Sequence, residues 1–380
     1  MGVYLNPGND MFCETVRGEI YVDKTELIRE TNRRLKTSQK FVCISRPRRF
    51  GKSMAAYMLA AYYGKDCDSS ELFSSYKIAT CDSYEKYLNK YNVIMLNIQD
   101  FFSMTSSVEE MLSCLQSEVI GELGEVYPDE VSKGEKILSL ALDRLYDKRK
   151  EAFVFIIDEW DCILRDKRYT LDDQKKYQDF IRLLLKDKAY VALAYMTGIL
   201  PIKKYATHSN LNMFDEYSMI DAGDFQEFVG FTEEEVRALC EQYQVDFDTM
   251  QSWYDGYTFP YVPHVYNPKS VVDSIRRKRF GSYWTQTETY EALKIYIDLN
   301  YDGLKEDIIE MLTGQRICIY TGRFQNDMIT FKSKDDVLTL LVHLGYLAYD
   351  SERSEVFIPN IEIRGEFRNA VTGDGSGTEM

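Results

Sequence analysis

Four short apolar runs separated by helical segments restrict the fold of this chain more than any other feature. FVCIS (41–45), NVIMLNI (92–98), FVFII (153–157) and YVALAYMTG (190–198) are rich in β-branched and aromatic residues. Such runs are typical of parallel strands that are covered on both faces. A helical pattern lies between each pair of runs, for example SVEEMLSCLQSEVIGEL, which Ser107 can cap. The alternation predicts a doubly wound α/β domain whose ligand lies at the carboxyl ends of the strands.

The segment SRPRRFGKS (45–53) joins the first apolar run to a helical stretch that ends at Gly64. Its last residues match the phosphate-loop pattern G-x-x-x-x-G-K-[ST]. At a junction of this kind Lys52 can reach the β- and γ-phosphates, and the Ser53 hydroxyl can join the shell of a Mg²⁺ ion. A G-K-S tripeptide also recurs by chance, so the match needs support from a second motif.

Arg46 stands where the pattern has its first glycine, and two more arginines follow it. A residue with a Cβ adopts positive φ only at a cost, so the strand must enter the loop by a different turn, and Pro47 removes an amide donor. In exchange, guanidinium groups surround the predicted phosphate site, and one of them can act as an arginine finger in cis. The alternative is pairing with local carboxylates such as Asp158. The predicted nucleotide-binding residues are Arg46, Arg48, Arg49, Phe50, Gly51, Lys52, Ser53 and Met54.

The supporting motif is the acidic pair Asp158 and Glu159, which follows the run FVFII. Asp158 can hold Mg²⁺ together with Ser53, and Glu159 can orient or deprotonate the attacking water. Two carboxylates at the end of a buried strand are costly without a cation or hydrogen-bond partners, which favours a functional site. Thr197 either contacts the γ-phosphate or the attacking water, as a second catalytic residue, or merely begins a turn. Asp161 is a supporting acid or, as the interpretation we favour, a solvated aspartate at a helix start.

The second half of the chain has a different character. Thr232 and Glu235 form a capping-box pattern at the start of a helix, and an aromatic, proline-containing segment follows. We expect a P-loop ATPase α/β domain at 1–222, a helical and aromatic-rich lid segment at 223–288, a winged-helix-like α+β module at 289–370, and a disordered tail at 371–380.

Composition excludes several classes of function. A formal net charge of -15 disfavours a general polyanion-binding surface, and the one basic cluster, residues 276–279, is interpreted as a solvated helix end. Any nucleic-acid contact would have to be local, and nucleic-acid binding stays an open alternative. Eight cysteines without a C-x-x-C pair predict reduced, mostly buried thiols and a cytoplasmic location. No apolar stretch is long enough to span a membrane.

Several short blocks together resemble the bacterial AAA-ATPase-like family. In order, they are YVDKTELI (21–28), SRPRRFGKS, FIIDEWD, TGILPIKK (197–204), VGFTEEEV (229–236), WYDGYTF (253–259), VYNPKSV (265–271) and LGYL with IPNIEIRGEF (344–367). The resemblance implies that the arginine-rich loop is the family's own variant. It also implies that Lys52 and Ser53 serve phosphate and Mg²⁺, that Asp158 and Glu159 are the acidic pair, and that residues 21–24 lie near the base or ribose. ATP is preferred over GTP mainly because of the family.

The expected function is therefore Mg²⁺-dependent ATP binding, with hydrolysis that drives a conformational switch. The alternatives are a nucleotide-binding regulatory or interaction module with little turnover, and a DNA-associated factor that partners a nuclease. A protein partner or a homo-oligomer is possible, and no membrane partner is expected. Members of the resembling family often continue into a PD-(D/E)XK nuclease-like domain. The residues after these blocks contain no D…(D/E)-x-K constellation, so nuclease activity is not predicted.

Overall fold

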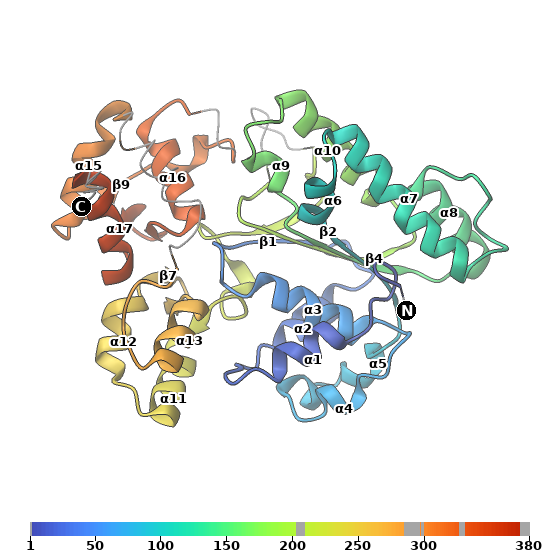
Figure 1. The fold of residues 1–380 in the computed structure, drawn as a ribbon, viewed down its shortest axis with the longest axis horizontal. Coiled ribbons are helices and arrows are strands. Elements are labelled where there is room, and N and C mark those ends of the chain that lie inside the picture. Colours follow the sequence, from blue (N-terminus) through green and yellow to red (C-terminus); the bar gives the residue numbers. More distant parts are fainter. Residues whose placement is uncertain (1, 203–209, 285–296, 298–299, 327–330, 373–380) are drawn as a thin grey trace, which may run out of the picture. The chain divides into compact units, whose positions relative to one another are not determined.

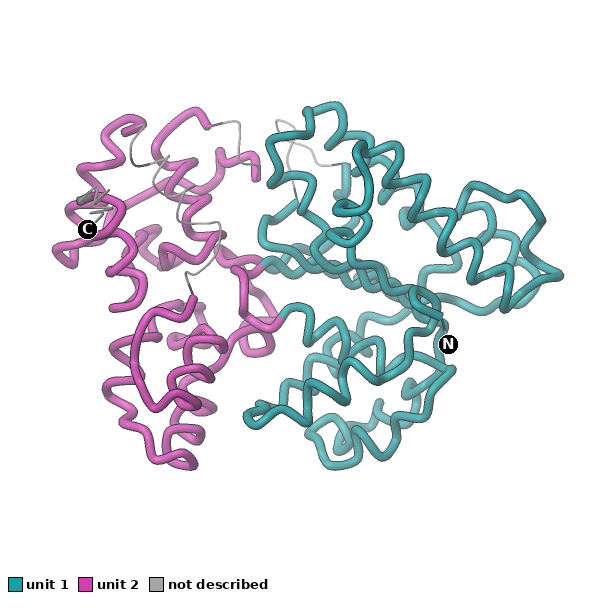
Figure 2. Tube along the Cα trace, viewed as in Figure 1, with its two compact units in different colours: residues 1–45, 52–217 teal, residues 46–51, 218–380 magenta. Residues whose placement is uncertain are grey.

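The computed structural model describes residues 2–202, 210–284, 297, 300–326 and 331–372. The chain divides into two compact units, which Figure 2 shows in different colours. The first unit is Met1–Ser45 and Lys52–Tyr217, and the second is Arg46–Gly51 and Ser218–Met380. The short segment 46–51 therefore belongs to the second unit, although residues of the first unit precede and follow it in the sequence.

The first unit is built on a five-stranded parallel sheet in the order β2-β3-β4-β1-β5. The strands are β1 (Phe41–Ser45), β2 (Asn92–Asn97), β3 (Phe153–Asp158), β4 (Val191–Gly198) and β5 (Asp215–Tyr217). Every residue of β1, β3 and β4 is buried, as the apolar runs predict. The predicted doubly wound α/β fold is confirmed. β5 was not predicted, because it is a short strand in which Asp215 and Glu216 are exposed.

Helices cover both faces of this sheet. The bounds are α1 (Asp10–Val16), α2 (Glu26–Arg34), α3 (Lys52–Tyr63), α4 (Ser70–Phe73), α5 (Tyr84–Tyr87), α6 (Ile98–Met104), α7 (Val108–Val126), α8 (Leu138–Arg149), α9 (Cys162–Arg165) and α10 (Leu171–Leu185). Figure 1 shows α1 to α5 on one face and α6 to α10 on the other. Ser107 caps α7 as predicted, because its hydroxyl accepts a hydrogen bond from the Glu110 N–H at 3.2 Å.

The register of the strands brings their carboxyl ends to one edge of the sheet. Asn97 lies opposite Asp158, and Ile44 lies opposite Thr197. The segments that leave β1, β2, β3 and β4 therefore all start at this edge. It is the edge at which open α/β sheets bind their ligands.

The second unit contains two small antiparallel sheets, in the orders β6-β8-β7 and β10-β11-β9. Its strands are β6 (Phe231–Thr232), β7 (Tyr257–Phe259), β8 (Val262–Tyr266), β9 (Ile317–Cys318), β10 (Ala348–Asp350) and β11 (Glu355–Phe357). Its α-helices are α11 (Glu233–Tyr243), α12 (Phe247–Tyr254), α13 (Pro268–Arg277), α15 (Leu304–Leu312), α16 (Lys334–Leu344) and α17 (Ile361–Thr372). The capping box of Thr232 and Glu235 is present at the start of α11.

The C-terminal elements follow in the order α15, β9, α16, β10 and β11, with β11 between β9 and β10, and the winged-helix-like module at 289–370 stays a prediction. The lid segment at 223–288 and this module both fall in the second unit, and the boundary between them stays a prediction. Helix α17 extends to Thr372, two residues into the expected tail, and residues 373–380 lie outside the described residues. The basic cluster at 276–279 includes the end of α13, where Lys278 adopts the left-handed conformation.

The eight cysteines all lie in the described part of the chain, and each of them is free. Only Cys43, Cys162 and Cys240 are buried, so the expectation of mostly buried thiols is wrong. Cys318 is exposed, and the other four are partly exposed. Among the described residues, no helix is both long and apolar enough to cross a membrane.

Candidate functional site

Asp158, the last residue of β3, is buried and hydrogen-bonded at the edge of the sheet. Its Oδ1 accepts hydrogen bonds from the Thr197 hydroxyl at 2.8 Å and from the Glu159 N–H at 3.0 Å. Both bonds use the same oxygen, which leaves Oδ2 for another ligand. Thr197 does more than begin a turn, because its hydroxyl joins the end of β4 to the acidic end of β3.

Asp161 is fully buried, so its interpretation as a solvated aspartate at a helix start is wrong. Its Oδ2 accepts hydrogen bonds from the N–H groups of Ile199 at 3.1 Å and Leu200 at 2.8 Å. The same oxygen lies 3.0 Å from Nε of Arg165. The chain folds back after β3, where the Trp160 N–H donates to the Thr197 carbonyl, and this turn brings Asp161 under the end of β4. Asp161 therefore fastens the segment after β4 to the segment after β3.

Glu159 lies beside Asp158 and makes an ion pair with Arg165. Its Oε2 is 2.6 Å from Nη2 of Arg165, and its backbone has a positive φ of 51°. Burial raises the pKa of Glu159 above its ordinary value, and the positive charges of Lys52 and Arg165 oppose that rise. Sequence reasoning missed Arg165. The spacing of Asp161 and Arg165, four residues apart at the start of a helix, is the signal that predicts such a pair.

Lys52 is the first residue of α3 and is buried. Burial lowers the pKa of its ammonium group, whereas the negative charges of Glu159, Asp158 and Asp161 raise it. Three carboxylates are therefore close enough to influence this one cation. Ser53, the next residue, is partly exposed, and Met54 is exposed.

Arg46 is buried within the second unit. Its guanidinium carbon lies 5.0 Å from the centre of the Phe259 ring, and Nη2 is 3.4 Å from the carbonyl oxygen of Phe225. A guanidinium over an aromatic face in a buried site gains a cation–π attraction of about 2 kcal/mol. These contacts engage Arg46 with the aromatic segment that follows residue 222.

Arg48 and Phe50 are also held by residues of the second unit. The carbonyl oxygen of Arg48 accepts a hydrogen bond from the Trp284 indole N–H at 3.2 Å. The Phe50 ring is buried and packs edge-on against Tyr257 at 5.3 Å, and the Tyr257 hydroxyl donates to the Gly345 carbonyl at 2.6 Å. The loop is thus anchored by the side chains of Tyr257 in β7 and of Trp284, and the Gly345 carbonyl after α16 in turn holds Tyr257.

Arg49 and Gly51 make the turn of this loop, with positive φ values of 68° and 93°. Gly51 meets the conformational requirement without strain, and Arg49 meets it at a cost. Arg49 is exposed and, among the described residues, forms no ion pair. In the same part of the structure, the N–H groups of Arg49, Phe50 and Gly51 donate no hydrogen bond. Such unpaired amides in a turn are the donors from which anion-binding loops are built.

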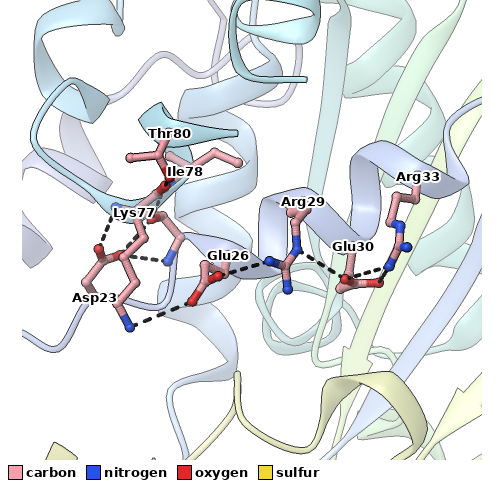
Figure 3. A network of polar contacts seen from close by, with 9 residues as sticks. Asp23, Glu26, Arg29, Glu30, Arg33, Lys77, Ile78 and Thr80 are labelled. Carbon is pink, nitrogen blue, oxygen red and sulfur yellow. Dashed lines mark hydrogen bonds and ion pairs between the residues drawn. The ribbon is translucent and has the colours of Figure 1, made fainter. Parts of the chain in front are cut away.

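The segment 21–24, which the family resemblance places near the base or ribose, is held by a polar network (Figure 3). Oδ1 of Asp23 accepts from the Thr25 N–H at 2.8 Å, and Oδ2 accepts from the Lys77 N–H at 2.8 Å. The network continues along α2, where Arg29 lies between Glu26 and Glu30. Asp23 therefore fixes the start of α2, and the position of the base stays a prediction.

Gly198, between Thr197 and Ile199, leaves no room for a side chain. A Cβ at this position would lie 2.6 Å from Oδ1 of Asp161 and 2.6 Å from the Trp160 ring. We expect Gly198→Ala to lower the free energy of unfolding by about 2 kcal/mol, because buried neighbours must move. Chemical denaturation measures this change. Gly121→Ala is the matched control, since a Cβ there meets no atom within 4 Å and the residue lies inside α7. An equal effect of both substitutions would contradict the packing argument.

Comparisons with known proteins agree with the motif analysis. A family model described as "Predicted AAA-ATPase" matches residues 11–207. A protein of Azotobacter chroococcum mcd 1, described as an uncharacterized protein in the vnfD 5′ region, is 26% identical over 362 residues. That alignment covers 86% of this chain and 62% of the relative, so the chain spans less than two thirds of the length of that protein.

Two solved structures are similar at low identity. The Walker-type ATPase paby2304 of Pyrococcus abyssi aligns with a TM-score of 0.44 and 13% identity, over 91% of this chain and 94% of that one. The ORC2 protein of Aeropyrum pernix, solved as ADPNP–ADP complexes, aligns with a TM-score of 0.39 and 11% identity, over 96% and 98% of the two chains. Because the family model matches more than half of the 380 residues, this chain belongs to the AAA-ATPase-like family.

Proposed function

We propose that this protein binds Mg²⁺-ATP through residues 46–54 and hydrolyses it at the carboxyl edge of the parallel sheet. The placement of buried Lys52 at the first residue of α3, in the same unit as buried Asp158 at the last residue of β3, carries this proposal. A buried ammonium at the start of a helix, close to acids at the end of a neighbouring strand, is the charge arrangement that phosphoryl transfer needs. The family assignment supports the same activity.

The loop supplies the donors for the phosphates. Lys52 contacts the β- and γ-phosphates, and the unpaired N–H groups of Arg49, Phe50 and Gly51 face phosphate oxygens together with the N-terminus of α3. Of the three arginines, Arg49 is the one that we assign to a phosphate contact, because it is exposed and unpaired among the described residues. Arg46 and Phe50 instead hold the loop in shape.

The donor set fits a Mg²⁺ ion. Among the described residues, no group of three or more His, Cys, Asp or Glu side chains is arranged to hold a metal by itself. Mg²⁺ in nucleotide sites is commonly bound by one or two protein oxygens, phosphate oxygens and waters. The Ser53 hydroxyl and Oδ2 of Asp158 would hold it here. When bound, the ion neutralises negative charge on the β- and γ-phosphates.

Glu159 and Thr197 act on the attacking water. The Thr197 hydroxyl donates a hydrogen bond to Asp158, so the hydroxyl oxygen is left to accept a hydrogen bond. Water can donate such a bond and the γ-phosphate cannot, which favours the water as the partner of Thr197. The water oxygen bonds to the γ-phosphorus, and the bond to the β–γ bridging oxygen breaks. One water proton passes to the Glu159 carboxylate, ADP leaves with the electron pair, and Glu159 then returns the proton to the released phosphate or to solvent.

The membership of segment 46–51 in the second unit supports the switch part of the proposal. Phosphates that bind this loop stabilise the one arrangement in which its amides face them. The anchoring contacts with Phe259, Tyr257 and Trp284 then favour the matching state of the second unit. These contacts do not require hydrolysis, which favours a nucleotide-dependent interaction module as the second candidate function.

Two measurements on the purified protein test the proposal. Titration with Mg²⁺-ATP, with and without a chelator, measures binding, and a phosphate-release assay measures hydrolysis. We expect saturable, Mg²⁺-dependent binding and slow turnover. Binding without phosphate release would select the module without turnover. Failure to bind at millimolar nucleotide would reject both candidates.

Phe259→Ala tests the link between the second unit and the loop. We expect nucleotide affinity to fall about 3- to 30-fold, because the contact of the ring with Arg46 is lost while the phosphate donors are intact. Isothermal titration calorimetry measures the change. Tyr261→Ala is the matched control, since this residue lies between β7 and β8 and is 87% exposed. Equal affinities of the parent and Phe259→Ala would rule out the link.

A further inference from the structure

We infer that Arg165 is a positioning residue for the hydrolytic step, holding the carboxylate of Glu159 so that its second oxygen meets the attacking water. The inference rests on the proposed ATPase function and assigns a residue to the same site. Arg165 lies at the end of α9 and was absent from the candidate residues of the sequence analysis.

The guanidinium of Arg165 bridges two acids through different nitrogens. Nη2 lies 2.6 Å from Oε2 of Glu159, and Nε lies 3.0 Å from Oδ2 of Asp161. The Arg165 side chain is only 12% exposed, so the contact with Glu159 is little screened by water. A planar fork of donors that binds two acceptors at once has little freedom to rotate. The position of the Glu159 carboxylate is therefore set by Arg165.

Asp161 fixes the position of the Arg165 guanidinium, because Asp161 is itself held by residues outside the short helix α9. The N–H groups of Ile199 and Leu200, directly after β4, both donate to the Asp161 oxygen that Arg165 contacts. Thr197 in β4 donates to Asp158. Thr197, which we propose as a partner of the attacking water, and the N–H groups that hold Asp161 thus lie at the same strand end. A continuous set of hydrogen bonds runs from β4 through Asp161 and Arg165 to Glu159.

The backbone of Glu159 is held at the other end of its side chain. Its N–H donates to Asp158, and its φ of 51° is a conformation that a non-glycine residue adopts at a cost. With the backbone fixed, the carboxylate has only side-chain rotations left, and the bond from Arg165 selects among them. That bond uses Oε2 and leaves Oε1 to take the proton from the water. Loss of Arg165 frees the carboxylate to rotate, which misplaces the base without touching the phosphate donors.

An ion pair that merely stabilises the fold makes a different prediction from a positioning residue. Loss of a pair that only stabilises the fold lowers the free energy of unfolding, and it can also lower nucleotide affinity. A positioning residue lowers the rate of the chemical step at constant affinity and has no further effect once the base is absent. The two roles are separated by measuring affinity, turnover and a double-mutant cycle on the full chain.

The experiment compares Arg165→Gln and Arg165→Lys with the parent, using Mg²⁺-ATP as the probe. We expect Arg165→Gln to lower phosphate release about 10- to 100-fold, the size of effect seen when a catalytic group is misplaced, while the Kd changes less than about 3-fold. Arg165→Lys should recover part of the rate, because its ammonium still reaches one carboxylate. Arg168→Gln is the matched control, since Arg168 is exposed and pairs with Asp166.

The double mutant completes the test. In a Glu159→Gln background, Arg165→Gln should lower the residual rate by less than about 2-fold, because the group that Arg165 positions is no longer a base. Parental turnover in Arg165→Gln, or an undiminished effect in the double mutant, would overturn the inference and leave the ATPase proposal intact. A parent that releases no phosphate would instead overturn the ATPase proposal, and the role of Arg165 with it. If Arg165→Gln does not fold, Arg165→Lys with parental turnover and affinity would overturn the inference.

Discussion

Replacing Glu159 with glutamine is expected to abolish most phosphate release while nucleotide stays bound. The amide has the same shape as the carboxylate and keeps an oxygen that accepts from Arg165, but it cannot take a proton from water. General-base catalysis contributes about 10²- to 10⁴-fold to a rate, so turnover should fall by a factor in that range. Affinity should change little, because Glu159 is not among the phosphate donors.

Phosphate release and the nucleotide content of the protein after gel filtration measure this prediction together. Bound ATP should survive in the Glu159→Gln protein under conditions in which the parent yields ADP. Glu125→Gln is the control, since Glu125 is an exposed residue of α7 in the same unit. Turnover unchanged in Glu159→Gln would show that another group activates the water.

Replacing Lys52 with alanine is expected to have the second largest effect, on binding rather than on turnover. Removing one partner from a buried, hydrogen-bonded charge pair commonly costs several kcal/mol, so affinity for ATP should fall about 100-fold or more. The loss has two sources in this site. The phosphates lose a cation, and Asp158, Glu159 and Asp161 lose the positive charge that offsets their repulsion of the nucleotide.

Calorimetric titration with Mg²⁺-ATP measures the affinity, and thermal denaturation without nucleotide checks the fold. The matched control is Lys65→Ala, because Lys65 lies just beyond the other end of α3 and pairs with Glu151. That variant should bind ATP like the parent. Equal affinity in Lys52→Ala would place the phosphates elsewhere in the molecule.

Local sequence patterns predicted much of the first unit because its strands are buried on both faces. The runs at β1 and β3 consist mainly of apolar, β-branched and aromatic residues, which are typical of buried strands, and their bounds were predicted to within about one residue. β5 has no such pattern, since two of its three residues face solvent. The cap residues Ser107 and Thr232 were recognised because a cap depends only on residues next to it in the chain.

The surroundings of the loop were harder to predict. Arg46 contacts Phe259 and Phe225, which are far from it in the sequence, and no local pattern records such a contact. Asp161 looked like an exposed residue because its partners are main-chain N–H groups after another strand. The pairing of Arg165 with Asp161 could have been predicted, because a separation of four residues along a helix is typical of an ion pair. Contacts such as the Asp161–Arg165 pair are thus open to prediction from spacing, whereas contacts with residues far away in the sequence are not.

The loop at 46–51 also limits how this protein can diverge. Its residues are enclosed by side chains that lie after residue 222, yet they are encoded between two elements of the first unit. A change at Phe259 or Tyr257 is therefore felt at Arg46 or Phe50, and compensating substitutions have to arise at distant codons together. The second unit is also not contiguous in the sequence. Exchange of residues 218–380 alone between relatives would therefore separate these residues from the loop at 46–51 that their side chains contact.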